Sequence, residues 1–325
     1  MRVVREIFSL ILVIGLVACT QSSPTRSSSQ PTEGGHCADW REQPMPIERD
    51  LSSVDFIDEQ TGWVVGDIGE LEGVVVKTSN GGQQWQIVSK VQEFLSDVDF
   101  IDAEKGWAVG YAGTVIGSTD GGKSWERLRY GENLEALNAV HFLDAIAGWV
   151  VGTGGLILHT TDAGKSWQNV DAGVKQDLWR VRFLNANQGW IVGEEGLILT
   201  TVDGGENWTQ CNSGVKVALF DIWPVDTQVI WAVGEGGTLL KSSDSGINWQ
   251  PQRINYDNLL RAIQFIDINR GYLIGSSGLM LCTSDGGEHW QSIPMSRQLS
   301  FAGLKLTAKG YGWAVGRRGR IVSNK

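Results

Sequence analysis

The sequence is poor in the side chains from which most metal and nucleophilic sites are built. It has 4 cysteines and 4 histidines among 325 residues, and they form neither a CxxC pair nor a His cluster. A zinc centre or a Ser-His-Asp set needs such groups in converging positions. We therefore expect no metal, no cofactor and no catalytic residue.

Positive charge is also scarce. The chain carries 27 Lys and Arg against 37 Asp and Glu, for a formal net charge of −10. Binding of nucleic acid needs a basic surface, because contacts to the phosphate backbone dominate affinity. The charge balance therefore argues against nucleic acid as the partner.

The apolar run at the N-terminus is short. Ile7 to Val17 is eleven residues long, too few to cross a bilayer but suited to the core of a signal peptide. The run ends in LVAC, which resembles the bacterial lipoprotein signal whose cysteine, here Cys19, becomes lipidated. We expect a lipoprotein signal peptide at 1–18 and export to a membrane surface. Residues 19–36 are rich in Ser, Pro and Thr, so we expect a flexible tether there.

Three cysteines remain after Cys19. Cys37, Cys211 and Cys282 are an odd number and lack metal-binding spacing. A single disulfide with one free thiol and a set of buried thiols are both compatible with this count.

Two motifs recur through the rest of the chain, which is rich in Gly (42) and Trp (15). One is an Asp-box turn, STDGGKSW at 118–125, with related copies at 78–85, 160–167, 201–208, 242–249 and 283–290. The other is GWxVG, whose seven copies place an aromatic residue at 63, 107, 149, 190, 231, 272 and 313. Each period of 41 to 44 residues holds four short strands, which is typical of a propeller blade.

The two chain ends explain why seven GWxVG motifs accompany six boxes. The chain stops where a seventh box would begin. Trp40 precedes Trp63 by 23 residues, the interval that elsewhere separates a box Trp from the next motif aromatic. We therefore predict an all-β, seven-bladed β-propeller at 37–325, closed by N- and C-terminal strands that share the last blade and leave no open seam.

The Asp boxes have the pattern of scaffold rather than of chemistry. A catalytic site needs different residues that converge on one point, whereas these turns repeat at symmetric places. Their hydroxyl and carboxylate oxygens can accept hydrogen bonds from backbone N–H groups of the same turn. We assign a structural role to the box carboxylates Asp120, Asp162, Asp203, Asp244 and Asp285.

The combined unit VxFxDxxxGWxVGxxGxIxxTxDGGxxW resembles the photosystem II assembly and stability factor family over residues 38–325. The lipoprotein-like start is similar to that of cyanobacterial members. The resemblance implies a non-enzymatic propeller of the thylakoid lumen that binds an early photosystem II reaction-centre subunit through an arginine-rich patch. In a host without photosystem II, the expected location is the periplasm or cell envelope.

Residues that do not recur mark where a partner would bind. Trp179 and Trp223 lie outside the repeat on innermost strands, with Arg180, Arg182 and Arg261 in the same or adjacent blades. Arg and Trp are enriched at binding hot spots, and Arg pairs bidentately with carboxylates. Two interpretations stay open, in which the tryptophans fill the central channel or the cluster binds a partner.

A second break in the repeat is GRRGR, with Arg317, Arg318 and Arg320. It is a candidate contact for an anionic partner or a lipid headgroup, and a solvated loop is the alternative. The arginine-rich patch of the family corresponds either to this loop or to Arg180 and Arg182.

Asp boxes also occur in sialidases, so a sialidase-like glycoside hydrolase is the enzymatic alternative. Such a site needs three arginines from separate blades, for which Arg182, Arg261 and Arg318 are candidates, with a Tyr–Glu pair as nucleophile. None of the 5 tyrosines stands in an Arg-rich setting. We therefore predict a non-enzymatic, protein-binding lipoprotein of photosystem II assembly, with a general envelope scaffold as the second hypothesis.

Overall fold

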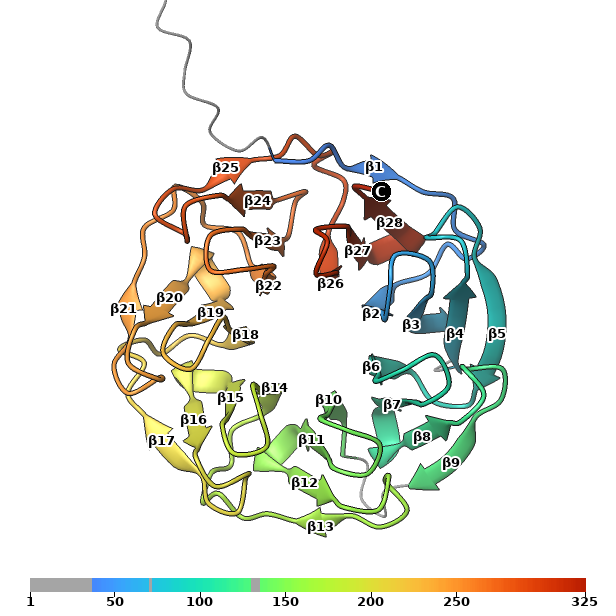
Figure 1. Ribbon diagram of the computed structural model, residues 1–325, viewed down its shortest axis with the longest axis horizontal. Coiled ribbons are helices and arrows are strands. Elements are labelled where there is room, and N and C mark those ends of the chain that lie inside the picture. The colour runs from blue at the N-terminus through green and yellow to red at the C-terminus, as the bar shows by residue number, and fades with distance from the viewer. Residues whose placement is uncertain (1–36, 70–71, 130–134) are drawn as a thin grey trace, which may run out of the picture. The chain divides into compact units, whose positions relative to one another are not determined.

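The computed structural model describes residues 37–69, 72–129 and 135–325. The predicted signal peptide, the predicted tether and Cys19 lie outside these residues. The described residues form 28 strands in seven four-stranded antiparallel sheets, arranged as blades around a central channel (Figure 1). Within this described part, no helix is long and apolar enough to span a membrane.

The first four blades each take consecutive strands from the centre outward. Blade 1 holds β2 (Leu51–Phe56), β3 (Gly62–Gly69), β4 (Glu72–Thr78) and β5 (Gln86–Val91). Blade 2 holds β6 (Leu95–Phe100), β7 (Gly106–Gly110), β8 (Val115–Ser118) and β9 (Glu126–Arg129). Blade 3 holds β10 (Leu137–Phe142), β11 (Gly148–Gly152), β12 (Ile157–Thr160) and β13 (Gln168–Asn169). Blade 4 holds β14 (Leu178–Phe183), β15 (Gly189–Gly193), β16 (Ile198–Thr201) and β17 (Thr209–Cys211).

The remaining blades follow the same plan until the ring closes. Blade 5 holds β18 (Leu219–Pro224), β19 (Ile230–Gly234), β20 (Leu239–Ser242) and β21 (Gln250–Pro251). Blade 6 holds β22 (Leu260–Phe265), β23 (Gly271–Gly275), β24 (Met280–Thr283) and β25 (Gln291–Ser292). Blade 7 holds β26 (Phe301–Leu306), β27 (Gly312–Gly316), β28 (Arg320–Ser323) and, as its outer strand, β1 (Arg41–Glu42).

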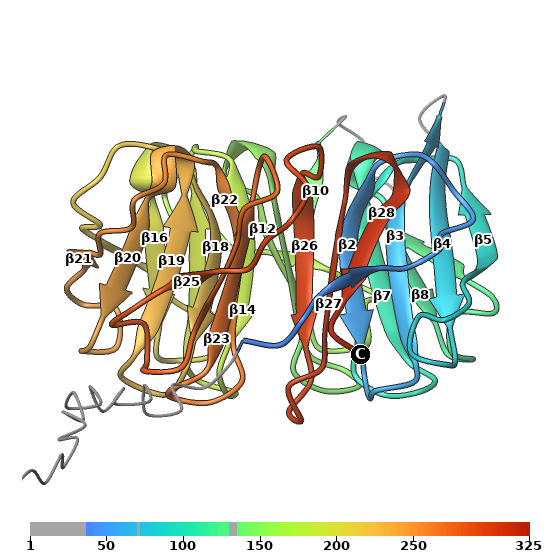
Figure 2. The same ribbon diagram turned by 90° about the horizontal axis from the view of Figure 1, so that it is seen from above.

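The strands run between two faces of the ring (Figure 2). We call one the η face, because the turns between second and third strands include the 3₁₀ turns η1 (Tyr111–Gly113), η2 (Thr153–Gly155), η3 (Glu194–Gly196), η4 (Glu235–Gly237) and η5 (Arg317–Gly319). The other is the box face, where third strands end in the Asp boxes. The five GWxVG residues of each second strand are all buried, since each blade has a sheet on either side.

Aromatic stacks join neighbouring blades. The Trp63 ring of blade 1 stacks on Phe100 of blade 2, with centroids 3.5 Å apart and planes 5° apart. Trp107 stacks on Phe142 of the next blade in the same way, at 3.5 Å and 6°. Such pairs contribute about 1 kcal/mol beyond the area that they bury. The motif tryptophans therefore hold the blades to one another.

The structure confirms the predicted closure of the ring. In β1, Arg41 pairs with Ser323 and Glu42 with Val322 of the C-terminal strand β28. Trp40 is buried, and its ring lies 5.5 Å from that of Tyr272 in edge-to-face contact. Pairing of the two chain ends in one sheet gives the last blade its fourth strand and closes the ring.

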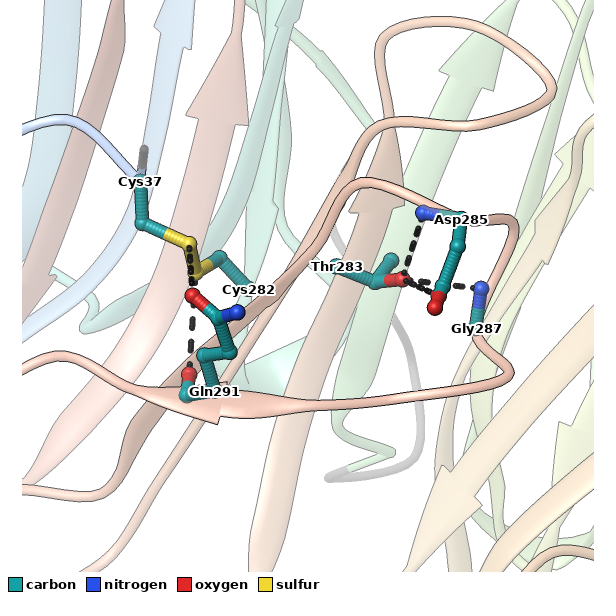
Figure 3. The surroundings of a disulfide bond; sticks show 6 residues. All are labelled: Cys37, Cys282, Thr283, Asp285, Gly287 and Gln291. Carbon is teal, nitrogen blue, oxygen red and sulfur yellow. Dashed lines mark hydrogen bonds between the residues drawn. A yellow bond between two sulfur atoms is a disulfide. The ribbon is translucent and has the colours of Figure 1, made fainter. Parts of the chain in front are cut away.

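A disulfide joins Cys37 to Cys282, across 245 residues of sequence (Figure 3). Cys211 is a free thiol, and burial raises its pKa. The sequence count left a single disulfide and a set of buried thiols open. The structure selects the disulfide because ring closure brings the N-terminal segment beside blade 6.

Candidate partner-binding site

The innermost strand of every blade carries a β-bulge near its start. The register shifts between the first and third residues, for example between Leu178 and Arg180. A bulge re-aims the side chains around it, so the second and third residues of each strand both face the channel. The bulged residues form a ring at the η-face mouth: Ser52, Ser96, Asn138, Trp179, Phe220, Arg261 and Ala302.

The third residues of these strands close the channel. Arg180 Nη1 lies 2.8 Å from Asp97 Oδ2 of blade 2, and its Nε lies 3.2 Å from Asp221 Oδ1 of blade 5. Ser53 Oγ donates to Asp97 Oδ1 at 2.6 Å. Burial acts to lower the pKa of Arg180, but the two carboxylates outweigh it and the pKa is raised. We call Arg180, Asp97 and Asp221 the channel plug.

A further ring lies on the box side of the plug, at the fifth residue of each innermost strand. Its members are Asp55, Asp99, His141, Arg182, Trp223, Gln264 and Lys305. Lys305 Nζ and Asp55 Oδ1 are paired at 2.5 Å, and the Arg182 guanidinium lies 5.4 Å from the Trp223 ring centroid. Lys305 and Arg182, the two positively charged side chains of this ring, therefore each have a partner within the ring.

Two acid–base groups in this ring have strongly shifted pKa values. Burial and the nearby charge of Asp55 raise the pKa of Asp99 to about 7. Burial and the charge of Arg182 lower the pKa of His141 to about 3. Asp99 Oδ2 accepts from the backbone N–H of Phe142 at 2.6 Å, which ties blade 2 to blade 3.

The η-face mouth is an open cavity of about 660 Å³ above the plug. Its volume lies within the range of ligand pockets in proteins, about 300–1,000 Å³. Aromatic and cationic groups line much of the wall, and small polar groups such as Ser52 and Ser96 lie between them. The plug residue Arg180 also contributes to its wall, so the cavity is a funnel with a closed floor.

The cationic side of the mouth is an assembly of rings and guanidinium groups. The Arg261 guanidinium lies 4.3 Å from the Phe220 ring centroid, and Phe220 meets Trp179 edge to face at 5.9 Å. Trp179 Nε1 donates to Glu194 Oε1 at 2.9 Å. Burial and the positive charge of Arg317 lower the pKa of Arg261. The charge of Glu235 acts on this pKa in the opposite direction. Two arginines that line the same cavity suit an anionic group of a partner.

Arg317 reaches the mouth from η5 of blade 7. Its side chain is 72% exposed, and its Nε lies 3.9 Å from Asp50 Oδ2. Across the mouth, the rings of Phe94 and Tyr111 meet edge to face at 5.5 Å, and Tyr111 is 51% exposed. Exposed aromatic and arginine side chains around a concave floor are the residue types of binding hot spots.

The structure separates the residues that the sequence grouped as partner-binding. Trp179, Arg261 and Arg317 line the mouth, whereas Arg180 lies in the plug with its side chain 14% exposed. Arg182 and Trp223 lie on the box side of that plug.

Two arginines of the GRRGR loop do not line the mouth cavity. Arg320 pairs with Glu42 of the outer strand at 2.7 Å. Arg318 is exposed and donates its backbone N–H to Asp50 Oδ1 at 3.0 Å. The three arginines considered for a sialidase-like site, Arg182, Arg261 and Arg318, therefore lie in three different environments and do not converge.

Each Asp box is bonded within its own turn. In blade 3, Thr160 Oγ1 donates to Asp162 Oδ1 at 2.8 Å and accepts from Gly164 N–H at 2.9 Å. Ser166 Oγ donates to Asp162 Oδ2 at 2.6 Å. The bonds from Ser166 lower the pKa of Asp162 to about 2. The corresponding carboxylates Asp120, Asp203, Asp244 and Asp285 make equivalent bonds.

Sequence reasoning missed several members of this site. Asp97 and Asp221 are the plug partners of Arg180, and Tyr111 and Phe94 complete the mouth. The sequence carried one signal for the plug. The third residue of the innermost strand is an arginine in blade 4 and an aspartate in blades 2 and 5. In the described part of the chain, no three His, Cys, Asp or Glu side chains gather to hold a metal ion.

Comparison with protein families identifies a match that spans most of the propeller. The family model described as Photosynthesis system II assembly factor YCF48 matches residues 86–176, 166–250 and 207–315. These segments cover more than half of the 325-residue chain. No curated protein sequence matches the chain.

Solved structures share the fold. A structure of YCF48 bound to D1 peptide aligns with a TM-score of 0.75 and 22% identity, covering 89% of this chain and 98% of that chain. YCF48 from Cyanidioschyzon merolae aligns with a TM-score of 0.71 and 21% identity, covering 88% and 98%. A streptogramin B lyase aligns with a TM-score of 0.73 and 10% identity, covering 87% and 96%. Identities this low show a common fold alone.

Proposed function

The chain belongs to the family of the photosynthesis system II assembly factor YCF48, and we propose that it acts in photosystem II assembly by binding a segment of the reaction-centre subunit D1. The η-face mouth is the place where this segment binds. The family supports the process, and the related structure of YCF48 with D1 peptide supports the partner.

The observation that carries this proposal is the chemistry of the mouth. Arg261 and Arg317 bring two positive charges to one side of a closed funnel, beside the rings of Trp179 and Phe220. An acidic side chain or carboxylate of an extended segment would relieve the repulsion between them. The neighbouring rings would cover an apolar residue of the same segment. The site thus fits a peptide with acidic and apolar residues close together.

Binding rather than catalysis is the role that these groups support. Asp177 Oδ1 accepts from the backbone N–H of Gly154 at 2.8 Å, and Asp50 is engaged by the η5 turn. These mouth carboxylates therefore secure loops. Glu194 accepts the bond from Trp179, which orients the indole. Such groups build a rigid receptor surface.

A lipid anchor on Cys19 and a location at the lumenal side of the thylakoid membrane complete the proposal. The LVAC signal and the Ser-rich segment at 19–36 support the anchor. The Cys37–Cys282 disulfide supports an exported location, because such bonds persist in oxidising compartments. Mass spectrometry of the protein from host membranes tests the anchor, with loss of the lipid and release to the soluble fraction expected for Cys19→Ser. A wild-type protein without lipid on Cys19 would overturn it.

The experiment for partner binding is calorimetric titration of the protein with synthetic D1 peptides. We expect Arg261→Gln combined with Arg317→Gln to weaken binding at least about 30-fold, which corresponds to about 2 kcal/mol. Arg270→Gln is the matched control, because Arg270 lies on the box face and pairs with Asp267.

The outcomes separate the alternatives. An unchanged affinity in the double variant would remove the mouth from the proposal. Failure of the wild-type protein to bind any D1 segment would overturn D1 as the partner and favour the general envelope scaffold. In that case, proteins captured from host membranes would identify the partner.

A further inference from the structure

The seam between blades 6 and 7 differs from the other seams because blade 7 has no Asp box. At five of the other six seams of the described chain, the box of one blade accepts a bond from the blade before it. Trp63 Nε1 of blade 1 donates to Gly121 O in the blade 2 box at 3.0 Å, and Lys77 Nζ donates to the same oxygen at 2.7 Å. Lys241 of blade 5 donates to Gly286 O in the blade 6 box at 3.4 Å. At the last seam this acceptor is missing.

The cysteines occupy the matching places at that seam. Lys77 lies opposite Trp63 in the strand register, and Cys282 lies opposite Tyr272 in the same way. Cys282 thus stands where blades 1 and 5 place their bridging lysines. Cys37 stands three residues before Trp40, as the second box glycine stands three residues before each box Trp. The acceptor carbonyls belong to the residue before that glycine, such as Gly121. The disulfide therefore links the lysine position of one blade to the residue next to the hydrogen-bond acceptor position of the following blade.

The strand that this disulfide secures has few other bonds. β1 contains two residues and pairs only with β28. Gln43 N–H donates to Ile321 O at 3.0 Å, and Arg320 pairs with Glu42 at 2.7 Å. In blades 1 to 6, the box turn connects the outer strand covalently to the third strand. Blade 7 lacks that connection, because its outer strand comes from the other end of the chain.

The disulfide is within reach of solvent. Cys37 and Cys282 line an open cavity of about 180 Å³ together with Tyr272, Arg270 and Lys309. Cys37 is partly exposed, and Gln291 Oε1 lies 3.8 Å from its Sγ (Figure 3). Cys282 is buried, so a small dithiol would attack the disulfide at the Cys37 sulfur. Thiol–disulfide exchange requires such access.

The segment after β1 connects this seam to the mouth. Gly319 N–H of η5 donates to Arg49 O at 2.6 Å, and Arg318 N–H donates to Asp50 Oδ1 at 3.0 Å. The same 3₁₀ turn carries Arg317, which lines the mouth. Loosening of the N-terminal segment would therefore loosen the turn that positions Arg317.

We propose that the Cys37–Cys282 disulfide replaces the missing seventh box as a redox-controlled clasp, and that its reduction weakens partner binding at the mouth through η5. The part that concerns binding rests on the proposed function. The reductant is a dithiol, which supplies two electrons and two protons. The S–S bond breaks, Cys37 and Cys282 become thiols, and the dithiol becomes a disulfide.

Hydrogen exchange tests the clasp without any partner. The protein is prepared as Cys211→Ser, so that Cys37 and Cys282 are the cysteines of the described chain that respond to a reductant. Alkylation followed by peptide mapping measures how much of this pair is reduced. With dithiothreitol we expect amide exchange at 38–45 and 320–325 to rise about 30-fold, the ratio that corresponds to about 2 kcal/mol. Exchange at β13, which a box holds in blade 3, should stay unchanged.

The double variant Cys37→Ser with Cys282→Ser is the control for dithiothreitol itself. It should show fast exchange at both ends under all conditions. Equal exchange in the oxidised and reduced protein would overturn the clasp, as would an equal rise in every blade, which would report general destabilisation.

Titration with the D1 peptide then tests the coupling. Reduction of the Cys211→Ser protein should weaken peptide binding about fivefold or more, the lower end of typical coupling between sites, with no effect in the double serine variant. An unchanged affinity would overturn the regulatory half of the proposal. If the oxidised protein fails to bind the peptide at all, the proposed function fails while the exchange result still decides the clasp.

Discussion

Arg180 in blade 4 reaches across the central channel to Asp97 in blade 2, with Nη1 and Oδ2 separated by 2.8 Å over 83 residues of sequence. Asp221 of blade 5 completes this plug. The plug divides the channel into an open mouth on the η face and a closed ring on the box side. A partner on the η face therefore meets a funnel with a floor.

Removal of the central cation should destabilise the whole ring. Arg180→Ala leaves Asp97 and Asp221 buried without a counter-charge, and loss of one partner of a buried pair costs about 3 kcal/mol or more. Urea unfolding measures this change. Arg180→Lys keeps the charge and should lose less, while Arg253→Ala on the exposed surface should lose almost nothing. A stable Arg180→Ala protein would contradict the structural role of the plug.

The titration of Asp99 should be visible as a pH-dependent stability difference. Its pKa is raised to about 7 in the folded protein, so the folded state holds a proton that the unfolded state releases above about pH 4. Stability from this group is present below about pH 4 and is lost as the pH rises toward 7.

The variant Asp99→Asn should remove that loss. Its stability relative to wild type should therefore increase between pH 4 and 7, by at most about 1.4 kcal/mol per pH unit. Urea unfolding at several pH values gives the difference. His141, with a pKa of about 3, works in the opposite direction as the pH falls below about 6.5, so the comparison with wild type is essential. A difference that is constant with pH would show that Asp99 is not shifted.

The Asp boxes should make the propeller sensitive to strong acid. The pKa values of Asp120, Asp162 and Asp203 are about 2 in the folded protein, below the ordinary value of about 3.9. Their stabilising contribution is present above about pH 4 and is lost as the pH falls toward 2. Unfolding should take up several protons in this window, and Asp162→Asn should reduce the number by about one. The same proton uptake in the variant would refute this assignment.

The aromatic stacks between blades give a further test of stability. Trp107 stacks on Phe142 and donates from Nε1 to Ala163 O at 2.9 Å. Trp107→Leu removes both contacts and part of the buried area, which should cost about 3 kcal/mol. Thermal unfolding monitored by far-ultraviolet circular dichroism measures it. A cost below about 1 kcal/mol would mean that the seam does not depend on this ring.

The repeat made the fold predictable to the level of individual blades. The spacing of GWxVG motifs and boxes fixed seven units, and the interval from Trp40 to Trp63 placed the N-terminal strand in the last blade. Both hold in the structure. These features could be recognised in the sequence because every blade packs the same residue types at the same places.

The site was harder to predict from the sequence because it depends on the β-bulge in each innermost strand. The bulged position holds residues as different as Ser96, Trp179 and Arg261, so no residue type marks it. Without the bulge, adjacent residues point to opposite faces of a strand. The mouth residue Trp179 and the plug residue Arg180 therefore could not be told apart from sequence.

The placement of Trp40 in the last blade could also have predicted the disulfide, with one further step. Placing Trp40 in the last blade also places Cys37 beside the third strand of blade 6, which holds Cys282. The count of three cysteines alone could not choose the pair. The register of both strands decides it.

The central claim is that a D1 segment binds in the η-face mouth. Hydrogen exchange of the full protein with and without a D1 peptide tests this directly. We predict protection at η1 and η5 and along the starts of β14 and β22, with the box turns unchanged. Protection confined to the box face, with the mouth unaltered, would contradict the claim.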